Sequence, residues 1–404
     1  MSQPIRPADE AGVVQAVRSA VADGTPLAIE GNGSKRGMLR PVQAAATLSL
    51  AGLSGITLYK PAELVLSARA GTPVAEIEAE LLRHNQMLPA EPPDFAALFG
   101  HERGSTIGGM VAANLSGPRR IGPGGALRDQ LLGVRAVTGD AEVIRSGGRV
   151  HKNVTGLDLC KLLAGSHGTL AVLTEVTLKL APRPEAQATL AVTVNSLAEG
   201  VAALSAGLGS PFGVSGAALL SRGLPDGKQD GGRPAALLRL EDFTRFLFRR
   251  TQALQKVLEP FGTVRLLEVE PSSRLWQGVR DATLLQAAPD QAVWRISVKP
   301  SFAPEVARRI GDAFEARMLF DWGGGLIWVA GPAETGSHVA VMAAVAEAGG
   351  VFTLFRAPDP MRTVLPVLPE EVPALAAIGA RVQRTLDPGG LLNPGRMRAA
   401  GVAG

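Results

Sequence analysis

The sequence predicts an α+β protein built from two domains, and three observations lead to this prediction. The chain has 404 residues, which is enough for two hydrophobic cores of ordinary size. Helix-like and strand-like hydrophobic patterns alternate as far as Pro182. A linker punctuated by prolines, residues 181–184, then precedes strands such as 189–194, 235–240 and 294–298 that alternate with helices.

The N-terminal elements follow from local patterns. Valines at 13 and 17 lie on one face of a helix over residues 9–23, with Asp9 as its cap and Gly24 just past its end. A strand over 26–30 follows directly. It leads into a loop that contains three glycines, residues 31–37.

The next elements are a strand and a helix that Pro73 opens. The strand covers 64–70, and Val74, Ile77 and Leu81 mark the inner face of the helix. Further along, two strands flank Gly139-Asp140, which predicts a β-hairpin with a two-residue connection: residues 131–138 and 141–145.

Composition excludes several classes of function. Hydrophobic residues make up 46% and charged residues 19%, as in a packed globular protein. The net charge of +4 comes without a basic run or an aromatic series for nucleic acid. Cys160 is the single cysteine, so no disulfide framework or thiolate metal site is expected. No apolar run is long enough to span a membrane, and a cytoplasmic protein is expected, with peripheral docking on the inner membrane left open.

Chemistry is first expected at the loop 31–37. Gly31, Gly33, Ser34 and Lys35 let backbone N–H groups converge on an anion, which favours a phosphate site. The order of Ser and Lys differs from a Walker A loop, and Arg36 replaces the third glycine of a dinucleotide fingerprint. A plain turn after a strand remains an alternative if the loop is considered alone.

Two later segments are also rich in small residues. The segment 104–117 lets a flat ligand lie against backbone, and Ser105, Thr106, Asn114 and Ser116 offer hydrogen bonds. A small-residue helix packed on a sheet explains the same pattern. The segment 165–176 is a turn into a strand that again presents backbone, although a core strand after a turn explains it when it is considered alone.

In this order and spacing, the three segments resemble the FAD-binding domain of the vanillyl-alcohol oxidase and para-cresol methylhydroxylase (PCMH) superfamily. The resemblance covers residues 1–182 and the Asn393-Pro394-Gly395 tail. It implies a PCMH-type FAD-binding domain of two subdomains at 1–182, an α+β cap domain at 183–366, and a C-terminal segment at 367–404 that returns to the first domain. The implied cofactor contacts are Gly31, Asn32, Gly33, Ser34, Lys35, Arg36, Ser105, Thr106, Ile107, Gly108, Gly109, Ala113, Asn114, Ser116, Gly117, Gly168, Thr169, Val172 and Asn393.

Finer phrases resemble the small flavin subunits of bacterial glycolate oxidases: Arg128-Asp129, Leu132-Gly133-Val134, the run 152–159 and the run 320–326. This resemblance implies oxidation of glycolate to glyoxylate with onward electron transfer. It also implies a larger flavin subunit and an iron–sulfur subunit as partners. The loop contains no His, Cys or Tyr, so FAD is expected to be bound non-covalently, and no metal is expected. Within the run 152–159, Lys152 to Gly156 is expected to be a turn that braces the flavin domain.

The expected cap domain contains one histidine, His338, which is too few for the histidine-rich metal site of related D-2-hydroxyacid dehydrogenases. A surface or capping role is expected for His338, and core positions for Trp276 and Trp322. No catalytic residue is assigned. Arg280, Arg295 and Lys299 carry charges that suit a carboxylate, and solvated positions on an exposed face are the alternative for them. A self-sufficient FAD-dependent D-lactate or 2-hydroxyacid dehydrogenase and a non-catalytic FAD-binding assembly subunit remain alternatives.

Overall fold

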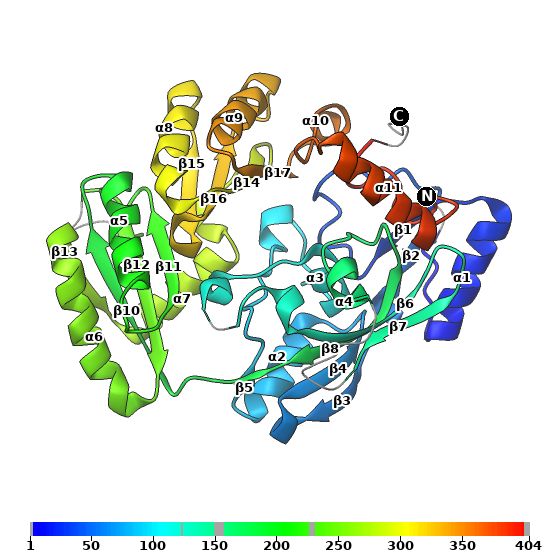
Figure 1. The fold of residues 1–404 in the computed structure, drawn as a ribbon, viewed down its shortest axis with the longest axis horizontal. Coiled ribbons are helices and arrows are strands. Elements are labelled where there is room, and N and C mark those ends of the chain that lie inside the picture. Colours follow the sequence, from blue (N-terminus) through cyan, green and yellow to red (C-terminus); the bar gives the residue numbers. More distant parts are fainter. Residues whose placement is uncertain (1–2, 123, 149–156, 226–230, 400–404) are drawn as a thin grey trace. The chain divides into compact units, whose positions relative to one another are not determined.

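The computed structural model describes residues 3–122, 124–148, 157–225 and 231–399. Its chain divides into two compact units. Unit 1 comprises Met1–Ser116, Ala126–Pro182 and Glu370–Gly404, and unit 2 comprises Gly117–Gly125 and Arg183–Pro369. Both contain helices and sheet (Figure 1), which confirms the α+β class. The segment Gly117–Gly125 was expected in the first domain, and the structure places it in unit 2.

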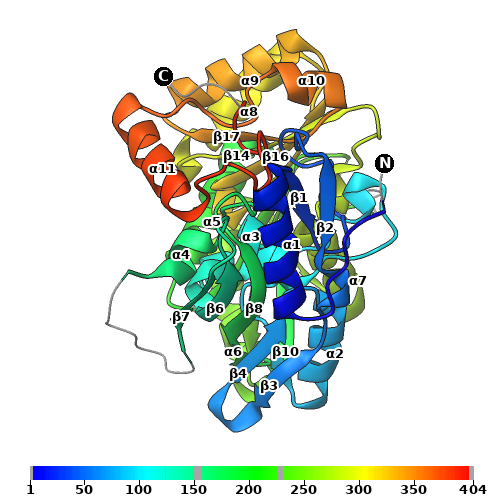
Figure 2. The ribbon, with the colours of Figure 1, turned by 90° about the vertical axis from the view of Figure 1, so that its right-hand side faces the viewer.

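Unit 1 begins with a helix beside a small parallel sheet (Figure 2). Helix α1 (Glu10–Asp23) is capped by the Asp9 side chain, which accepts a hydrogen bond from the Gly12 N–H, and it ends at a left-handed glycine, Gly24. Strand β1 (Leu27–Glu30) pairs in parallel with β2 (Ala46–Ser49). Single parallel bridges add Ile5 beside β2 and Leu392 beside β1.

The larger sheet of unit 1 is antiparallel throughout. Its five strands follow the order β3 (Ile56–Lys60), β4 (Val65–Arg69), β8 (Val172–Lys179), β6 (Leu131–Val137) and β7 (Val143–Gly147). A separate pair joins β5 (Gln86–Met87) to β9 (Ala181–Pro182). Unit 1 also contains the helices α2 (Val74–Arg83), α3 (Ile107–Ala113) and α4 (Leu159–Leu163).

Two sequence predictions for unit 1 can be compared directly with this sheet. Val74, Ile77 and Leu81 are the buried residues of α2, as their spacing predicted. The β6–β7 hairpin exists, but a two-residue connection was wrong. The second strand begins at Val143, because the Thr138 N–H donates to the Glu142 carbonyl and closes a longer turn.

Unit 2 is built on an eight-stranded antiparallel sheet. The strand order is β13 (Thr263–Leu267), β10 (Ala186–Thr193), β12 (Ala235–Asp242), β11 (Val214–Leu220), β15 (Arg317–Asp321), β16 (Leu326–Gly331), β14 (Ala292–Ser297) and β17 (Val351–Arg356). Its helices are α5 (Leu197–Leu208), α6 (Thr244–Leu258), α7 (Val269–Arg280), α8 (Ala303–Ala313), α9 (Thr335–Glu347) and α10 (Asp359–Val364).

The two faces of this sheet carry different neighbours. Successive residues of a strand point to opposite faces of the sheet, so the side chains of Leu238 and Arg239 in β12 lie on different faces. Leu238 lies under α5, where a Cβ atom on Gly207 would be 2.0 Å from it. Arg239 lies on the other face and stacks on Trp276 of α7, with 4.6 Å from its guanidinium carbon to the ring centroid.

Histidine 338 belongs to the core of unit 2. It lies in the first turns of α9, is 1% exposed, and its Nδ1 accepts a hydrogen bond from Trp294 Nε1 at 3.0 Å. The expected surface or capping role was therefore wrong, because α9 turns this face toward the sheet. The core positions of Trp276 and Trp322 are confirmed, since both side chains are buried.

The C-terminal part of unit 1 consists of α11 (Pro373–Leu386) and an extended segment. Asp387 follows the helix, and its carboxylate accepts from the Leu391 and Leu392 N–H groups at 3.1 and 2.9 Å. The segment then runs beside β1, where the Leu27 N–H donates to the Leu391 carbonyl at 2.8 Å. The Lys152 to Gly156 turn lies outside the described residues. Among the described helices, none has the length and apolar character that a membrane span requires.

Candidate functional site

The loop 31–37 leaves β1 and packs against the start of α3. The Asn32 side chain donates to the Gly104 carbonyl at 3.0 Å. A Cβ atom on Gly31 would lie 2.1 Å from Thr106 Oγ1, so only glycine permits this close approach. The first two small-residue segments of the sequence therefore meet in space.

Lys35 lies at the centre of this contact. Its ammonium group donates to Ser105 Oγ at 2.8 Å and lies 3.4 Å from Ser34 Oγ. Burial lowers the pKa of Lys35 to about 8, against the opposing charge of Asp94 and with the help of the nearby Arg396. Ser34 itself is buried. Among the described residues, two hydroxyls and the Met110 sulfur thus accept from this cation, and no carboxylate does.

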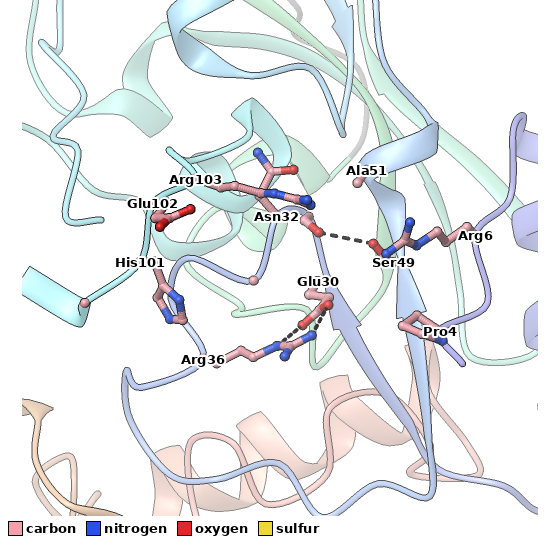
Figure 3. Close-up of a pocket in the computed structure, with 13 residues that line it drawn as sticks. Pro4, Arg6, Glu30, Asn32, Arg36, Ser49, Ala51, His101, Glu102 and Arg103 are labelled. Atoms are coloured by element: carbon pink, nitrogen blue, oxygen red, sulfur yellow. Dashed lines mark hydrogen bonds and ion pairs between the residues drawn. The ribbon is translucent and has the colours of Figure 1, made fainter. Parts of the chain in front are cut away.

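A pocket of about 460 Å³ opens beside the same loop (Figure 3). Gly31, Asn32 and Gly33 contribute backbone to its wall, and the Arg36 side chain forms a two-bonded ion pair with Glu30. The remaining lining residues were not predicted from the sequence: Pro4, Arg6, Glu30, Ser49, Ala51, Gly100, His101, Glu102 and Arg103. Arg103 directly precedes the small-residue segment, whereas nothing near Arg6 marks it as a pocket residue.

Helix α3 carries the second small-residue segment, and its glycines have different surroundings. Thr106 caps the helix by accepting from the Gly109 N–H at 3.3 Å. A Cβ atom on Gly108 would lie 2.6 Å from the Ala70 Cβ atom and 2.8 Å from the Ala70 carbonyl. A Cβ atom on Gly109 would instead lie 3.6 Å from the Lys35 Nζ atom. Gly108 therefore permits packing on β4, and Gly109 borders the lysine.

The side chains after α3 bind protein backbone. Asn114, left-handed at the end of the helix, accepts from the Arg128 N–H at 3.2 Å, and Ser116 accepts from the Leu127 N–H at 2.9 Å. Ala113 is the last residue of the helix, and Gly117 lies in unit 2. The polar groups expected here for a ligand therefore brace the turn that leads to β6.

The C-terminal segment reaches the third small-residue segment and the loop. Asn393 accepts from the Ile29 N–H at 2.7 Å and donates to the His167 carbonyl at 2.8 Å. A Cβ atom on Gly168 would lie 2.7 Å from the Asn393 amide nitrogen. Arg396 donates to the Lys35 carbonyl at 2.6 Å and to the Arg36 carbonyl at 3.2 Å. Arg396 was not predicted, since only its chain neighbours matched a motif.

The remaining predicted residues occupy less accessible positions. The side chains of Ile107 and Val172 are fully buried, so only their backbone is available to a ligand. Thr169 donates to the Ser166 carbonyl at 2.7 Å. His167 is half-buried with a left-handed backbone, and burial together with Arg396 and Lys35 lowers its pKa to about 3. Its imidazole is therefore neutral at physiological pH.

Comparison with known proteins places these segments in a family. Residues 2–147 match the FAD binding domain family. Over 387 residues, the chain is 36% identical to glycolate oxidase subunit GlcE of Escherichia coli, covering 96% of this chain and 97% of that protein. The chain belongs to the GlcE family of FAD-binding proteins.

Other relatives carry the names of oxidoreductases. The chain is 27% identical to the FAD-linked oxidoreductase Rv2280 of Mycobacterium tuberculosis, over 96% of this chain and 89% of that protein. A D-lactate dehydrogenase of Archaeoglobus fulgidus shares 29% identity over 46% of this chain and 40% of that protein. A solved 4-ethylphenol oxidase of Gulosibacter chungangensis shares the fold at 15% identity, with a TM-score of 0.71 over 98% of this chain and 89% of that one.

These findings confirm the superfamily, the fold and FAD as the cofactor. Three charged residues of unit 2 were considered for carboxylate binding in the sequence: Arg280, Arg295 and Lys299. Arg280 pairs with the adjacent Asp281 at 2.8 Å, and Lys299 is exposed. No group of three or more His, Cys, Asp or Glu side chains among the described residues has metal-binding geometry.

Proposed function

We propose that the chain is the FAD-binding subunit of a bacterial glycolate oxidase complex. The observation that carries the cofactor site is Lys35 of the loop 31–37, which donates to Ser105 in a chain related to GlcE along almost its whole length. The D-lactate dehydrogenases that match only part of the chain support the same substrate class, the 2-hydroxy acids.

The residues present fit the diphosphate of FAD. In the described part of the chain, the ammonium of Lys35 has hydroxyl acceptors and no carboxylate acceptor, so an anion that approaches it gains a charge-assisted hydrogen bond. The backbone of Gly31–Gly33 and the side chain of Arg103 line the pocket beside the same loop. The N–H groups of a glycine-rich loop and a nearby cation favour negative charge.

The loop is held in place by contacts that span the sequence. Thr106 supports Gly31, and Arg396 binds the carbonyls of Lys35 and Arg36. These contacts fix the direction of the N–H groups before a ligand arrives, which lowers the entropy lost on binding. We propose that Asn393 and Gly168 act in the same way, by joining β1 to the turn at His167.

When bound, FAD accepts a hydride from the C–H of a 2-hydroxy acid and passes the electrons onward. The chain supplies position and charge, and two groups of unit 2 that could accept a proton have structural contacts instead. His338 is buried and hydrogen-bonded to Trp294, and Asp321 accepts from the Trp322 N–H. We infer that a larger flavin subunit and an iron–sulfur subunit complete the reaction, as subunits of one complex.

Purification from the native source tests this proposal. The chain should carry FAD, acid precipitation should leave that FAD in the supernatant, and the larger flavin subunit and iron–sulfur subunit should co-purify. Flavin that stays in the pellet contradicts the non-covalent site. A flavin-free chain contradicts the proposed function itself, and a solitary flavin-loaded chain with full glycolate turnover favours the self-sufficient dehydrogenase.

A further inference from the structure

A cationic site in unit 2 remains outside the flavin machinery described above. It centres on Trp322, whose ring has two guanidinium carbons close to its centroid, Arg120 at 4.4 Å and Arg295 at 4.9 Å. Arg295 also lies 5.9 Å from the ring centroid of Trp328. Two positive charges thus gather around one indole, and the ring faces partly offset their repulsion.

The segment 117–125 brings Arg120 to this site. Its neighbour Arg119 forms a two-bonded ion pair with Glu241, at 2.9 and 2.6 Å. The Trp322 indole N–H donates to the Gly117 carbonyl at 3.0 Å. Arg120 is therefore presented by an anchored segment.

Trp322 is fixed just as firmly. It has a left-handed backbone, with a φ of 55°, which is costly for a large side chain. The Asp321 carboxylate accepts from the Trp322 N–H at 2.7 Å and stabilises this turn. A Cβ atom on Gly323 would lie 2.5 Å from Leu208, so α5 packs tightly on the turn. The run 320–326, singled out in the sequence, builds this arrangement.

Among the described residues, none forms a hydrogen bond or ion pair with the Arg295 side chain, although its guanidinium carries five donors. It is half-buried in β14. Burial and the charge of Arg120 lower the pKa of Arg295 to about 10, against the opposing charge of Asp321. Arg295 therefore stays charged at physiological pH and has donors available for an anion.

We propose that Arg295, with the added charge of Arg120 and seated on Trp322, binds the carboxylate of a small 2-hydroxy acid. A planar guanidinium matches a carboxylate through two parallel hydrogen bonds. The choice of a 2-hydroxy acid rests on the proposed function, whereas the carboxylate preference follows from the two arginines.

Titration of the FAD-loaded full chain with glycolate tests the site. Calorimetry and tryptophan fluorescence measure the binding. Glycolate and acetate should both saturate it, and ethylene glycol, which lacks a carboxylate, should not. Arg295→Gln should weaken glycolate binding about tenfold or more, because a charged hydrogen-bonded pair is lost. Arg120→Gln should weaken it less, because its charge acts without the direct contact.

The matched control is Arg249→Gln on α6, an exposed arginine of the same unit, which should leave glycolate binding unchanged. Thermal unfolding of each variant checks its folding, and Arg120→Gln keeps the test decisive if Arg295→Gln does not fold, since Arg120 is exposed. Unchanged binding in both variants, or no saturable binding by the parent chain, overturns the proposal.

A carboxylate side chain of a partner subunit has the same chemistry as the free acid. If the parent chain ignores glycolate and Arg295→Gln instead abolishes co-purification of the partners, the site takes that side chain and the small-acid proposal fails. The flavin content of the same samples separates the two ideas. Bound FAD without glycolate binding overturns only this site, and absent FAD overturns the proposed function.

Discussion

Each unit holds a cation that no described residue contacts as an ion-pair partner, and the two units hold it in different ways. Lys35 in unit 1 donates to Ser105, and burial brings its pKa down to about 8. Arg295 in unit 2 stacks on Trp322, and its pKa stays near 10. An ammonium held by hydroxyls can lose its proton close to physiological pH, whereas a stacked guanidinium cannot. The first site is therefore pH-sensitive and the second is a permanent positive charge.

The largest expected effect concerns turnover by the chain alone. FAD-loaded chain should reduce a dye with glycolate at least about 10²-fold more slowly than the assembled complex, because general base catalysis contributes that much or more. The buried His338 cannot supply the base. Steady dye reduction at the rate of the complex would sink this division of labour, and Asp321 would then be the first residue to mutate.

The second largest expected effect is weaker FAD binding when the charge of Lys35 is removed. Lys35→Met should raise the dissociation constant for FAD about ten- to a hundredfold, the range for a lost hydrogen bond to a charged group. Quenching of flavin fluorescence during titration of the flavin-free chain measures it. Lys60→Met removes an exposed lysine of the same unit and should have no effect. Equal affinities for FAD in both variants would remove Lys35 from the site.

Two neighbouring glycines separate packing from binding. Gly108→Ala should lower the free energy of unfolding by about 2 kcal/mol, because its Cβ atom would press on Ala70. Gly109→Ala should fold normally and reduce flavin loading, because its Cβ atom borders Lys35. Chemical denaturation and flavin content measure the pair. A stable Gly108→Ala variant without FAD would instead support a direct contact of Gly108 with the cofactor.

The smallest expected effect is a pH dependence. A bound diphosphate favours protonated Lys35, so FAD affinity should be highest below pH 8 and fall as the pH rises through about 8, by about tenfold per unit. The free energy of unfolding of the flavin-free chain should instead rise with pH over this range. Its lysine pKa lies below the ordinary 10.5, so this group adds stability as the pH rises from 8 toward 10.5. Lys35→Met should flatten both profiles.

Local signals predicted the local structure. The cap at Asp9, the stop at Gly24 and the inner face of α2 depend on residues a few positions apart, and the structure confirms them. The hairpin was recognised but its turn was not, since the Thr138–Glu142 closure is invisible in the Gly139-Asp140 pair.

The candidate site was predictable where a motif marks it. The loop 31–37 and the segment 104–117 were identified, but the roles of their small residues were not, because Gly31 and Gly108 make room for Thr106 and Ala70. Contacts between distant residues left no local signal. Arg119 pairs with Glu241 across 122 positions of the sequence. This ion pair lies within unit 2, to which the structure assigns the segment 117–125 that was expected in the first domain.

The contact between Asn393 and Ile29 also sets an order of events during synthesis. The two residues are 364 positions apart, so at ribosomal rates the loop 31–37 waits about 20 to 70 s for the segment that holds it. During that time Arg396 is absent too, and the carbonyls of Lys35 and Arg36 have no guanidinium to bind. A nascent chain arrested before Asn393 should therefore bind FAD poorly even when its first 182 residues have emerged. FAD binding by a nascent chain would therefore indicate that translation has passed Asn393.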